Sequence, residues 1–174
     1  MRIRIFNWES KRKLEEAAIS DELTGIYNRR GFLTVAEQQL TLARRLEKRV
    51  LLFSADIDNF KSINDKWGHE EGDRALIKTA NILKDSFRQS DIIGRIGGDE
   101  FTVFLTEDNK NTPEIITERV QRKFDIYNEE NTVKKYKLSL SCGIARCMPE
   151  HPCVLKELII QADRLMYKQK NHKH

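Results

Sequence analysis

Two groups of carboxylates in the sequence are able to hold a divalent cation. Asp56 and Asp58 end a nearly continuous apolar run that begins at Val50, and Asp99 and Glu100 follow a pair of glycines. Convergent carboxylates from neighbouring strands bind Mg²⁺, which in turn binds substrate phosphates. The sequence therefore predicts a site for nucleotidyl or phosphoryl transfer with an attacking hydroxyl. Two unrelated acidic surface turns are the alternative, because carboxylates are common at turns.

The glycine pair Gly97–Gly98 lies between two segments that are predicted as strands, Asp91–Ile96 and Phe101–Thr106. Two glycines at such a place mark a tight hairpin, because glycine adopts positive φ without a steric cost. A bulky ligand can also approach a turn that lacks Cβ atoms. An ordinary surface hairpin needs only turn-forming residues and is the alternative.

The apolar run from Val50 is typical of a strand that is buried on both faces. Its period of two places Asp56 and Asp58 on the same face. A buried carboxylate is costly without a counter-charge, so we expect a cation partner for Asp56. Asp58 has a second interpretation, as the N-cap of the next helix. The free N–H groups of that helix, at Phe60 and Lys61, are suited to hold a phosphate.

The remaining periodicity predicts one α/β domain with a central mixed, largely antiparallel sheet flanked by helices. Helices are predicted near residues 9–18, 32–48, 59–68, 70–87, 113–127 and 154–170, and a strand over 137–147. The apolar stripes of these helices predict core positions, among them Leu33, Leu46 and Ile115.

The composition limits the classes of function. The chain has 174 residues, is 39% hydrophobic and 33% charged, and carries a net charge of +4. This mild basic excess is compatible with an anionic ligand such as a nucleotide. No dense arginine-rich tract with interleaved aromatic residues occurs, so we expect no nucleic-acid partner.

The cysteines and the apolar runs bear on location. Cys142, Cys147 and Cys153 form no C-x-x-C spacing and are odd in number, so we expect no disulfide framework and a reducing cytoplasm. No apolar run approaches the ~20 residues that span a bilayer, so no membrane span is expected. The first residues are too interrupted for a signal peptide.

Several ordered motifs together resemble those of GGDEF-domain diguanylate cyclases, over roughly Ile19 to Lys170. The motifs are Asp21-x-Leu-Thr-Gly with Asn28-Arg-Arg, Asp56-x-Asp-x-Phe-Lys-x-Ile-Asn-Asp with Gly68-His and Gly72-Asp, Gly97-Gly-Asp-Glu-Phe, Ser141-x-Gly-Ile, and Ala162-Asp with Tyr167. Several motifs at family-like spacing are a specific signal, whereas a lone GGDEF string is not.

The resemblance implies the condensation of two GTP molecules into cyclic di-GMP, with release of two pyrophosphates. Each subunit of a homodimer presents one GTP, and each 3′-hydroxyl attacks the partner's α-phosphate. By this analogy Mg²⁺ or Mn²⁺ is bound by Asp56, the Ile57 carbonyl and Asp99. Asp99 is also implied to help deprotonate the hydroxyl, and Glu100 to complete the acidic catalytic site.

The same resemblance implies the substrate contacts. They are Phe60, Lys61, Gly97, Gly98 and Lys170 around the phosphates, and Asn64 and Asp73 at guanine. The alternatives for the guanine pair are a helix-end cap at Asn64 and first-turn stabilisation by Asp73. The tail departs from the family, because the usual Gly-Arg or Gly-Lys is missing and Lys173 substitutes only in part.

An inhibitory product site is implied by the spacing of Arg88 and Asp91 before the hairpin, which matches an RxxD motif. The arginine would bind phosphate and guanine, and the aspartate would accept from guanine. Arg119 is a candidate for a second arm. Without the resemblance, Arg88 is explained as a favourable charge at a helix end and Asp91 as the start of a strand or turn.

The predicted organisation is a signalling or linker helix over residues 1–18, followed by a diguanylate cyclase domain over residues 19–174. An upstream sensor domain is compatible with this arrangement. The main alternative is a catalytically weak domain that acts as a receptor for GTP or cyclic di-GMP. A third interpretation is another nucleotidyl cyclase or polymerase-like transferase with the same two-metal chemistry. Intact Asp56, Asp99 and Glu100 favour the enzyme.

Overall fold

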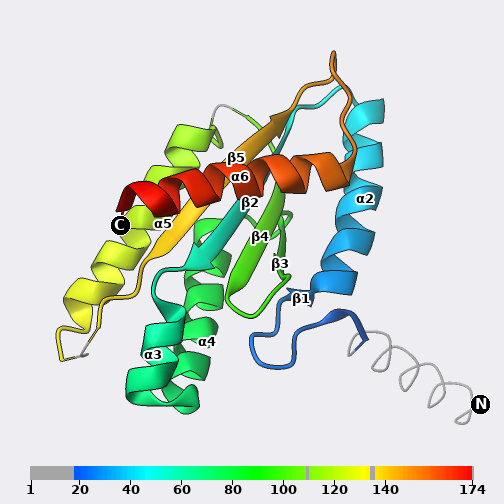
Figure 1. The fold of residues 1–174 in the computed structure, drawn as a ribbon. Coiled ribbons are helices and arrows are strands. Elements are labelled where there is room, and N and C mark those ends of the chain that lie inside the picture. Colours follow the sequence, from blue (N-terminus) through cyan, green and yellow to red (C-terminus); the bar gives the residue numbers. More distant parts are fainter. Residues whose placement is uncertain (1–17, 109, 134–135, 174) are drawn as a thin grey trace, which may run out of the picture.

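Among the residues that the structure describes, five strands form one mixed sheet in the order β1-β3-β4-β2-β5 (Figure 1). The computed structural model describes residues 18–108, 110–133 and 136–173. The strands are β1 (Tyr27–Asn28), β2 (Val50–Ile57), β3 (Ile92–Arg95), β4 (Glu100–Thr106) and β5 (Leu140–Cys147). Only β1 and β3 pair in parallel, and the other neighbours are antiparallel. The predicted fold class is confirmed, as is the β3–β4 hairpin; the short β1 was not predicted.

Helices cover both faces of this sheet. They are α2 (Arg29–Arg45), α3 (Phe60–Trp67), α4 (His69–Ser86), α5 (Pro113–Glu130) and α6 (Leu155–Lys173). Helices α2 and α6 pack on one face, whereas α3, α4 and α5 contribute to the core on the other. In Figure 1, α6 crosses β5 and β2, and its C-terminal end lies on the side of the molecule that holds α5.

The central strand β2 divides the core into two halves, because its side chains alternate between the faces. Leu52 packs with α2 and α6, whereas Leu51 and Phe53 pack with α4 and α5. Every residue of β2 is buried, as the apolar run predicts. Asp56 lies four residues after Leu52, so the alternation of the strand directs its side chain to the same face, which α6 covers.

Some helix positions predicted as core are exposed. Leu33 and Leu46 expose 36% and 55% of their surface, and Ile115 exposes 38%. Leu46 follows the last residue of α2, and Leu33 and Ile115 lie at the margins of their apolar stripes. Helical spacing alone therefore predicts a wider buried stripe on these helices than the structure shows.

The expectation about the cysteines is wrong for one pair. Cys147, at the end of β5, is joined by a disulfide to Cys153. The intervening turn folds back through the bridge between Met148 and His151, which brings the two Cα atoms to 6.0 Å. Because this approach depends on the turn, cysteine spacing did not reveal it, and the cysteines give no support for a reducing compartment.

Two further predictions concern an N-terminal helix and a membrane span. The helix predicted over residues 9–18 falls almost wholly on residues 1–17, which lie outside the described part of the structure. In the described ranges, none of the helices combines the length and the apolar character that crossing a membrane requires.

Helix α6 lies directly against the backbone of β5 at Gly143. A Cβ atom placed there would meet the backbone nitrogen of Met166 at 2.2 Å and the carbonyl oxygen of Ala162 at 2.3 Å. Real Cβ atoms do not approach backbone atoms so closely, so only glycine fits between this strand and this helix. Gly143 thereby sets how closely α6 approaches the sheet.

We predict that Gly143→Ala destabilises the protein by more than about 2 kcal/mol, because neither backbone can move aside without disturbing the core. For a domain of this size the melting temperature falls by roughly 4 °C or more. Gly98→Ala is the matched control, since its Cβ meets nothing within 4 Å. Thermal unfolding followed by circular dichroism measures both, and an unchanged value for Gly143→Ala would contradict the close packing.

Candidate active site

The two groups of carboxylates meet at one end of the sheet. The antiparallel register of β2 and β4 places Asp56 directly opposite Glu100. Beside this pair the Ile57 backbone N–H donates to the Asp99 carbonyl oxygen at 3.3 Å. The predicted convergence of the two acidic segments is therefore present, and Asp56, Ile57, Asp99 and Glu100 belong to one corner of the molecule.

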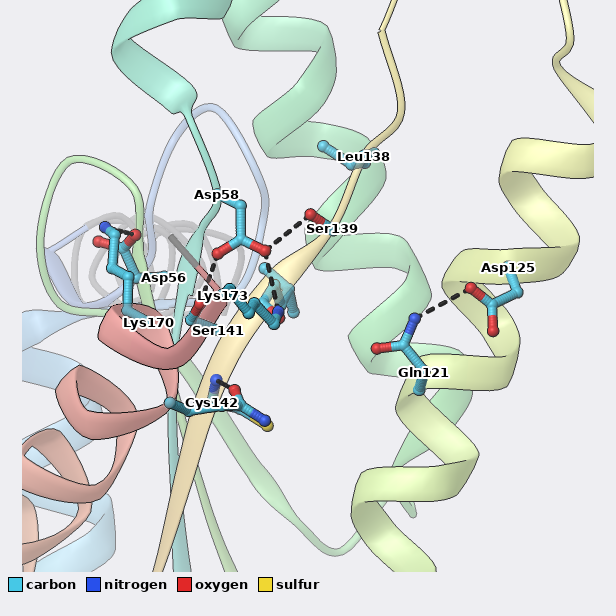
Figure 2. A network of polar contacts seen from close by, with 12 residues as sticks. Asp56, Asp58, Gln121, Asp125, Leu138, Ser139, Ser141, Cys142, Lys170 and Lys173 are labelled. Atoms are coloured by element: carbon cyan, nitrogen blue, oxygen red, sulfur yellow. Dashed lines mark hydrogen bonds and ion pairs between the residues drawn. The ribbon is translucent and has the colours of Figure 1, made fainter.

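Asp56 has the cation partner that its burial predicts. The Lys170 ammonium, from the last turns of α6, lies 2.5 Å from Oδ1 of Asp56, and the Asp56 side chain is only 11% exposed (Figure 2). Burial opposes the charge of Lys170, but the hydrogen bond to Asp56 together with the charges of Asp56, Asp99 and Asp58 outweighs burial and raises the pKa of this lysine. Lys170, implied above as a phosphate contact, is thus held at the acidic corner.

The other two carboxylates of the corner have raised pKa values. Burial and then the charge of Asp56 raise the pKa of Asp99. Burial, followed by the charges of Asp163 and Asp56, raises the pKa of Glu100, while Arg29 opposes this effect. These shifts reflect like charges that lie close together in a partly desolvated site. Asp163 and Arg29 were quoted above as parts of motifs but not assigned to the site.

The donors of this corner suit a hard divalent cation. Carboxylate and carbonyl oxygens are the ligands that Mg²⁺ prefers, and a cation would relieve the repulsion by Asp56 that adds to burial in raising the pKa of Asp99. The Lys170 ammonium already shows that Asp56 accepts a cation. Within the residues that the structure describes, no three histidine, cysteine or acidic side chains are gathered closely enough to form a metal cage. The corner therefore offers oxygen donors rather than a closed cage.

The hairpin that carries Asp99 is fastened by Arg95. Its Nε and Nη2 donate to the Gly98 carbonyl oxygen at 2.9 and 2.7 Å, and its Nη1 lies 3.1 Å from Oδ2 of Asp21. Burial would raise the pKa of Asp21, but hydrogen bonds from Thr24 and the charge of Arg95 outweigh burial and lower it. This network ties the hairpin to the turn before β1.

The reason given above for the two glycines of the hairpin is wrong. Among the described glycines, positive φ occurs only at Gly25 and Gly68. At Gly97 the absence of a Cβ leaves room for the Glu100 carboxylate, whose Oε2 would lie 2.3 Å from a Cβ and would have to move aside. At Gly98 a Cβ would meet nothing, so this face of the turn is open.

Asp58 does not cap the helix that follows it. The N-cap of α3 is Asn59, with φ of 57°, and its side chain makes no capping hydrogen bond. Asp58 instead accepts from the hydroxyls of Ser139 and Ser141 at 2.7 and 2.5 Å (Figure 2). Lys173 also lies 3.0 Å from Oδ2 of Asp58. Burial opposes the charge, yet these hydrogen bonds lower the pKa of Asp58.

Helices α3 and α4 bring the two candidate guanine contacts near each other. A Cβ at Gly72 would meet Oδ1 of Asn64 at 1.9 Å, so the Asn64 side chain lies against the first turn of α4. Asp73 is the next residue and is exposed. At the start of α3, Phe60 packs partly against the core and Lys61 is exposed. The arrangement leaves Lys61 and Asp73 exposed on the two helices that follow β2.

The candidate inhibitory residues lie at the other end of the sheet. Asp91 precedes β3, whose first residue, Ile92, pairs with Phe104 near the end of β4. Arg88 and Asp91 line a cavity of about 550 Å³, together with Lys84, Tyr27 and other residues. This volume is in the range of small-molecule sites. The backbone N–H of Arg88 donates to Asp91, at 2.8 Å from Oδ2.

The guanidinium groups near this cavity are engaged elsewhere. Arg88 makes a two-pronged contact with Asp108, with nitrogen–oxygen distances of 2.6 and 3.3 Å. Arg119 donates to Oδ1 of Asn111 at 3.0 Å and lies over the Phe87 ring. Arg119 is not among the described residues that line the cavity, although its charge opposes the rise in the pKa of Asp91 that burial causes.

Sequence reasoning missed the residues that support the acidic corner. Arg95 stands in the sequence beside the hairpin, but nothing local indicates that it bonds back to Gly98 and Asp21. Ser139 and Ser141 alternate with period two at the start of a strand, which was the available signal that they share a face. Lys173 was considered only as a substitute for a missing arginine.

Comparison with known proteins identifies the class. Residues 18–174 match the family described as "Diguanylate cyclase, GGDEF domain". The chain therefore belongs to the GGDEF domain family, as its motifs predict. The range matched includes every candidate site residue described above.

Two curated relatives are similar over most of this chain. The chain is 36% identical over 162 residues to the probable diguanylate cyclase DgcC of Escherichia coli K12, covering 93% of this chain and 43% of DgcC. It is 38% identical over 152 residues to the diguanylate cyclase DosC of the same strain, covering 84% of this chain and 32% of DosC. The chain thus spans less than half the length of these relatives.

Among solved structures, the chain resembles a microbial GGDEF domain described in a novel interaction mode with bis-(3′,5′)-cyclic di-GMP. The TM-score is 0.76 with 32% sequence identity, covering 91% of this chain and 94% of that one. A domain of this fold is therefore known in association with cyclic di-GMP.

We predict that Asp99→Asn raises the melting temperature at pH 7. The raised pKa of Asp99 means that the folded state binds its proton more tightly than the unfolded state. Stability therefore falls as the pH rises through the folded pKa, and an amide removes this loss. The gain disappears as the pH falls to about 4, the ordinary range of a carboxylate.

Asp21→Asn is the matched control with the opposite sign, because the pKa of Asp21 is lowered in the folded state. Its stabilising contribution is present at neutral pH and is lost as the pH falls through the folded pKa. We expect a lower melting temperature at pH 7 for this variant. A decrease for Asp99→Asn as well would show that the corner is not a source of repulsion.

Proposed function

We propose that this chain condenses two GTP molecules into cyclic di-GMP and two pyrophosphates. The observation that supports this most strongly is the cross-strand placement of Asp56 opposite Glu100, with Asp99 bonded to Ile57 through the backbone. These acidic groups converge in a chain of the GGDEF family. The alternative of two unrelated acidic turns is inconsistent with this geometry.

Asp56, the Ile57 carbonyl and Asp99 would hold Mg²⁺ or Mn²⁺. When bound, the metal polarises the α-phosphate and offsets the charge of the triphosphate. With a metal at Asp56, this carboxylate no longer needs the Lys170 ammonium as its counter-charge, and Lys170 is free for a second role. In this proposal Lys170 exchanges the Asp56 carboxylate for the triphosphate, together with Lys61 and the backbone N–H groups at Phe60 and the start of α3.

The carboxylates at the hairpin supply the acid–base chemistry. A general base is most effective when its pKa is near the working pH, and the pKa values of both Asp99 and Glu100 are raised in that direction. Asp99 accepts the proton of the attacking 3′-hydroxyl, and Glu100 completes the acidic site. Gly97 and Gly98 keep the turn low enough for the nucleotide to approach, as the open space at Gly98 supports.

Asn64 and Asp73 recognise guanine. A carboxylate accepts from guanine N1–H and N2–H, and an amide offers complementary hydrogen bonds. The contact between Asn64 and Gly72 supports this pairing, because it places the amide next to the turn that carries Asp73. This donor and acceptor set favours guanine over adenine and argues against a different nucleotidyl cyclase.

The proposed enzyme is a homodimer in the cytoplasm, where GTP is available. Each subunit presents one GTP, so that each 3′-hydroxyl faces the partner's α-phosphate. Residues 1–18 are proposed as a signalling or linker helix and residues 19–174 as the catalytic domain. Such a helix can connect the domain to an upstream sensor that controls how the two subunits face each other.

The catalytic proposal is tested by incubating the purified chain with GTP and Mg²⁺ and by quantifying cyclic di-GMP chromatographically. We expect product with the wild type and a loss of at least about 100-fold with Asp99→Ala, the scale of losing a group that acts in the transition state. Asp125→Ala, on the surface of α5, is the control and retains activity. Specific activity rises with protein concentration if a dimer is required.

Product that forms equally well with Asp99→Ala would overturn the assignment of this corner. No product at any concentration, with the fold intact, would favour the receptor interpretation instead. That second candidate is supported by the cavity of about 550 Å³ beside Arg88 and Asp91.

We also propose that this cavity is an inhibitory site for cyclic di-GMP, with Arg88 and Asp91 as its recognition pair. Arg88 then has to leave Asp108, with which it forms an ion pair. An exposed ion pair contributes about 0.2–1 kcal/mol, so Asp108 competes weakly with a phosphate. Arg119 supports the site through its charge rather than by lining the cavity.

We predict that Arg88→Ala weakens cyclic di-GMP binding by at least about tenfold, because a charge-assisted phosphate contact is lost. Asp108→Asn should strengthen binding by about two- to fivefold, since it frees Arg88. Arg146→Ala is the control, because Arg146 pairs with Glu107 without lining the cavity. Isothermal titration calorimetry measures all three, and full affinity in Arg88→Ala would exclude this site.

A further inference from the structure

Asp58 is the most completely bonded carboxylate near the acidic corner, and neither the metal nor the base chemistry uses it. Its side chain is 7% exposed. Ser141 donates to Oδ1, and both Ser139 and Lys173 donate to Oδ2 (Figure 2). One carboxylate therefore connects the end of β2, the start of β5 and the last turn of α6.

The orientation of these bonds distinguishes Asp58 from a metal ligand or a helix cap. A carboxylate has about four acceptor positions, and three are filled by partners on β5 and α6. The Asp58 backbone N–H also donates to the Ser139 carbonyl oxygen at 3.0 Å, so the peptide continues the β2–β5 ladder. Both the backbone and the side chain thus bind Asp58 to the same strand.

Lys173 connects this cluster to the helix. Its ammonium donates to Asp58 at 3.0 Å and to the Leu140 carbonyl oxygen at 2.5 Å. Lys170 lies one turn earlier on the same helix face, where it contacts Asp56. Gln169, beside it, accepts from the backbone N–H of Cys142 at 2.5 Å. The last two turns of α6 are therefore attached to the sheet at three points.

The attachment matters because helix ends fray. The last four carbonyl groups of a helix have no partners within it, so its final turn is the least stable part. Gly143 fixes the middle of α6 against β5, and among the contacts described the end beyond Lys170 is held through Lys173, by the Asp58 carboxylate and the Leu140 carbonyl oxygen. Without that pair, Lys170 has more conformations to lose when it binds a ligand.

We propose that Asp58 is a positioning residue, which holds Lys173 and thereby places Lys170 for the triphosphate of GTP. This inference rests on the proposed function, because it assumes that Lys170 contacts the substrate. Ser139 and Ser141 orient the Asp58 carboxylate, and Lys173 transmits its position to the helix. Asp58 touches neither GTP nor the metal and acts through Lys170.

The competing explanation is a direct phosphate contact by Lys173. The two explanations give opposite results for Asp58→Asn. If Lys173 binds phosphate, the removal of the Asp58 charge frees its ammonium, and GTP affinity stays constant or rises. If Lys173 is an anchor, the removal of its partner loosens the helix end, and GTP affinity falls.

The experiment measures the affinity of the full chain for 3′-deoxy-GTP with Mg²⁺ by calorimetry, because this nucleotide lacks the attacking hydroxyl and does not turn over. We expect Asp58→Asn and Lys173→Met each to weaken binding by about three- to tenfold, the net effect of one ordinary hydrogen bond. The double variant should be no weaker than the worse single variant. Lys173→Arg should restore most of the affinity.

Lys170→Met provides a control that distinguishes the positioning role from a general loss of stability. Once Lys170 is absent, adding Asp58→Asn should cause no further loss, because Asp58 acts only through Lys170. With GTP, the variants should raise KM while kcat changes little. Lys173→Met keeps the test valid if Asp58→Asn folds poorly, since the Lys173 side chain is 36% exposed.

The outcomes distinguish a failure of the proposed function from a failure of the positioning role. No binding of 3′-deoxy-GTP by the wild type would overturn the proposed function and this inference with it. Binding by the wild type, with full affinity in Asp58→Asn or with additive losses in the double variant, would overturn only the positioning role. An equal loss from Asp58→Asn in the presence and absence of Lys170 would also contradict it.

Discussion

The structure depends on the carboxylates that are held close together at the end of β2 and the start of β4. The register of these strands holds Asp56 opposite Glu100 and Asp99 beside Ile57, in surroundings where solvent screens charge only in part. Burial first, and then the repulsion between such carboxylates, raise the pKa values of Asp99 and Glu100. A fold that maintains this arrangement has to provide a cation or bind one. Here Lys170 provides it, and the same charge balance makes the corner receptive to a metal.

Helix α6 supplies this compensation and is shaped for it along its length. Gly143 lets the helix approach the sheet closely, and the last turns then extend over the ends of β2 and β5. Asp56 and Asp58 lie two residues apart on one face and meet Lys170 and Lys173, which are three residues apart on one helical face. The spacing of side chains on the strand thus matches their spacing on the helix, so that two carboxylates pair with two lysines. The Asp56–Lys170 pair lies nearer the proposed chemistry, and the Asp58–Lys173 pair holds the end of the helix.

The two ends of the sheet differ in what they offer to a ligand. The acidic corner presents unsatisfied negative charge, whereas the opposite end presents a cavity bordered by Arg88 and Asp91. The strands β3 and β4 connect the two, since the hairpin that carries Asp99 begins where β3 ends. A ligand bound beside Asp91 would therefore contact β3, the strand that leads into the acidic hairpin. This continuity gives the proposed product site a physical route to the proposed active site.

The sequence by itself determined the elements and the chemistry, because both depend on local patterns. The apolar run of β2, the glycine pair of the hairpin and the period-two spacing of Asp56 and Asp58 are readable without coordinates, and family-like motifs named the class. The tertiary structure decided which charges meet. The bonds of Asp58 to Ser139 and Lys173 join residues 81 and 115 positions apart, and no local rule specifies such a contact. Spacing likewise did not reveal the Cys147–Cys153 disulfide, because it forms only when the turn after β5 brings the two residues together.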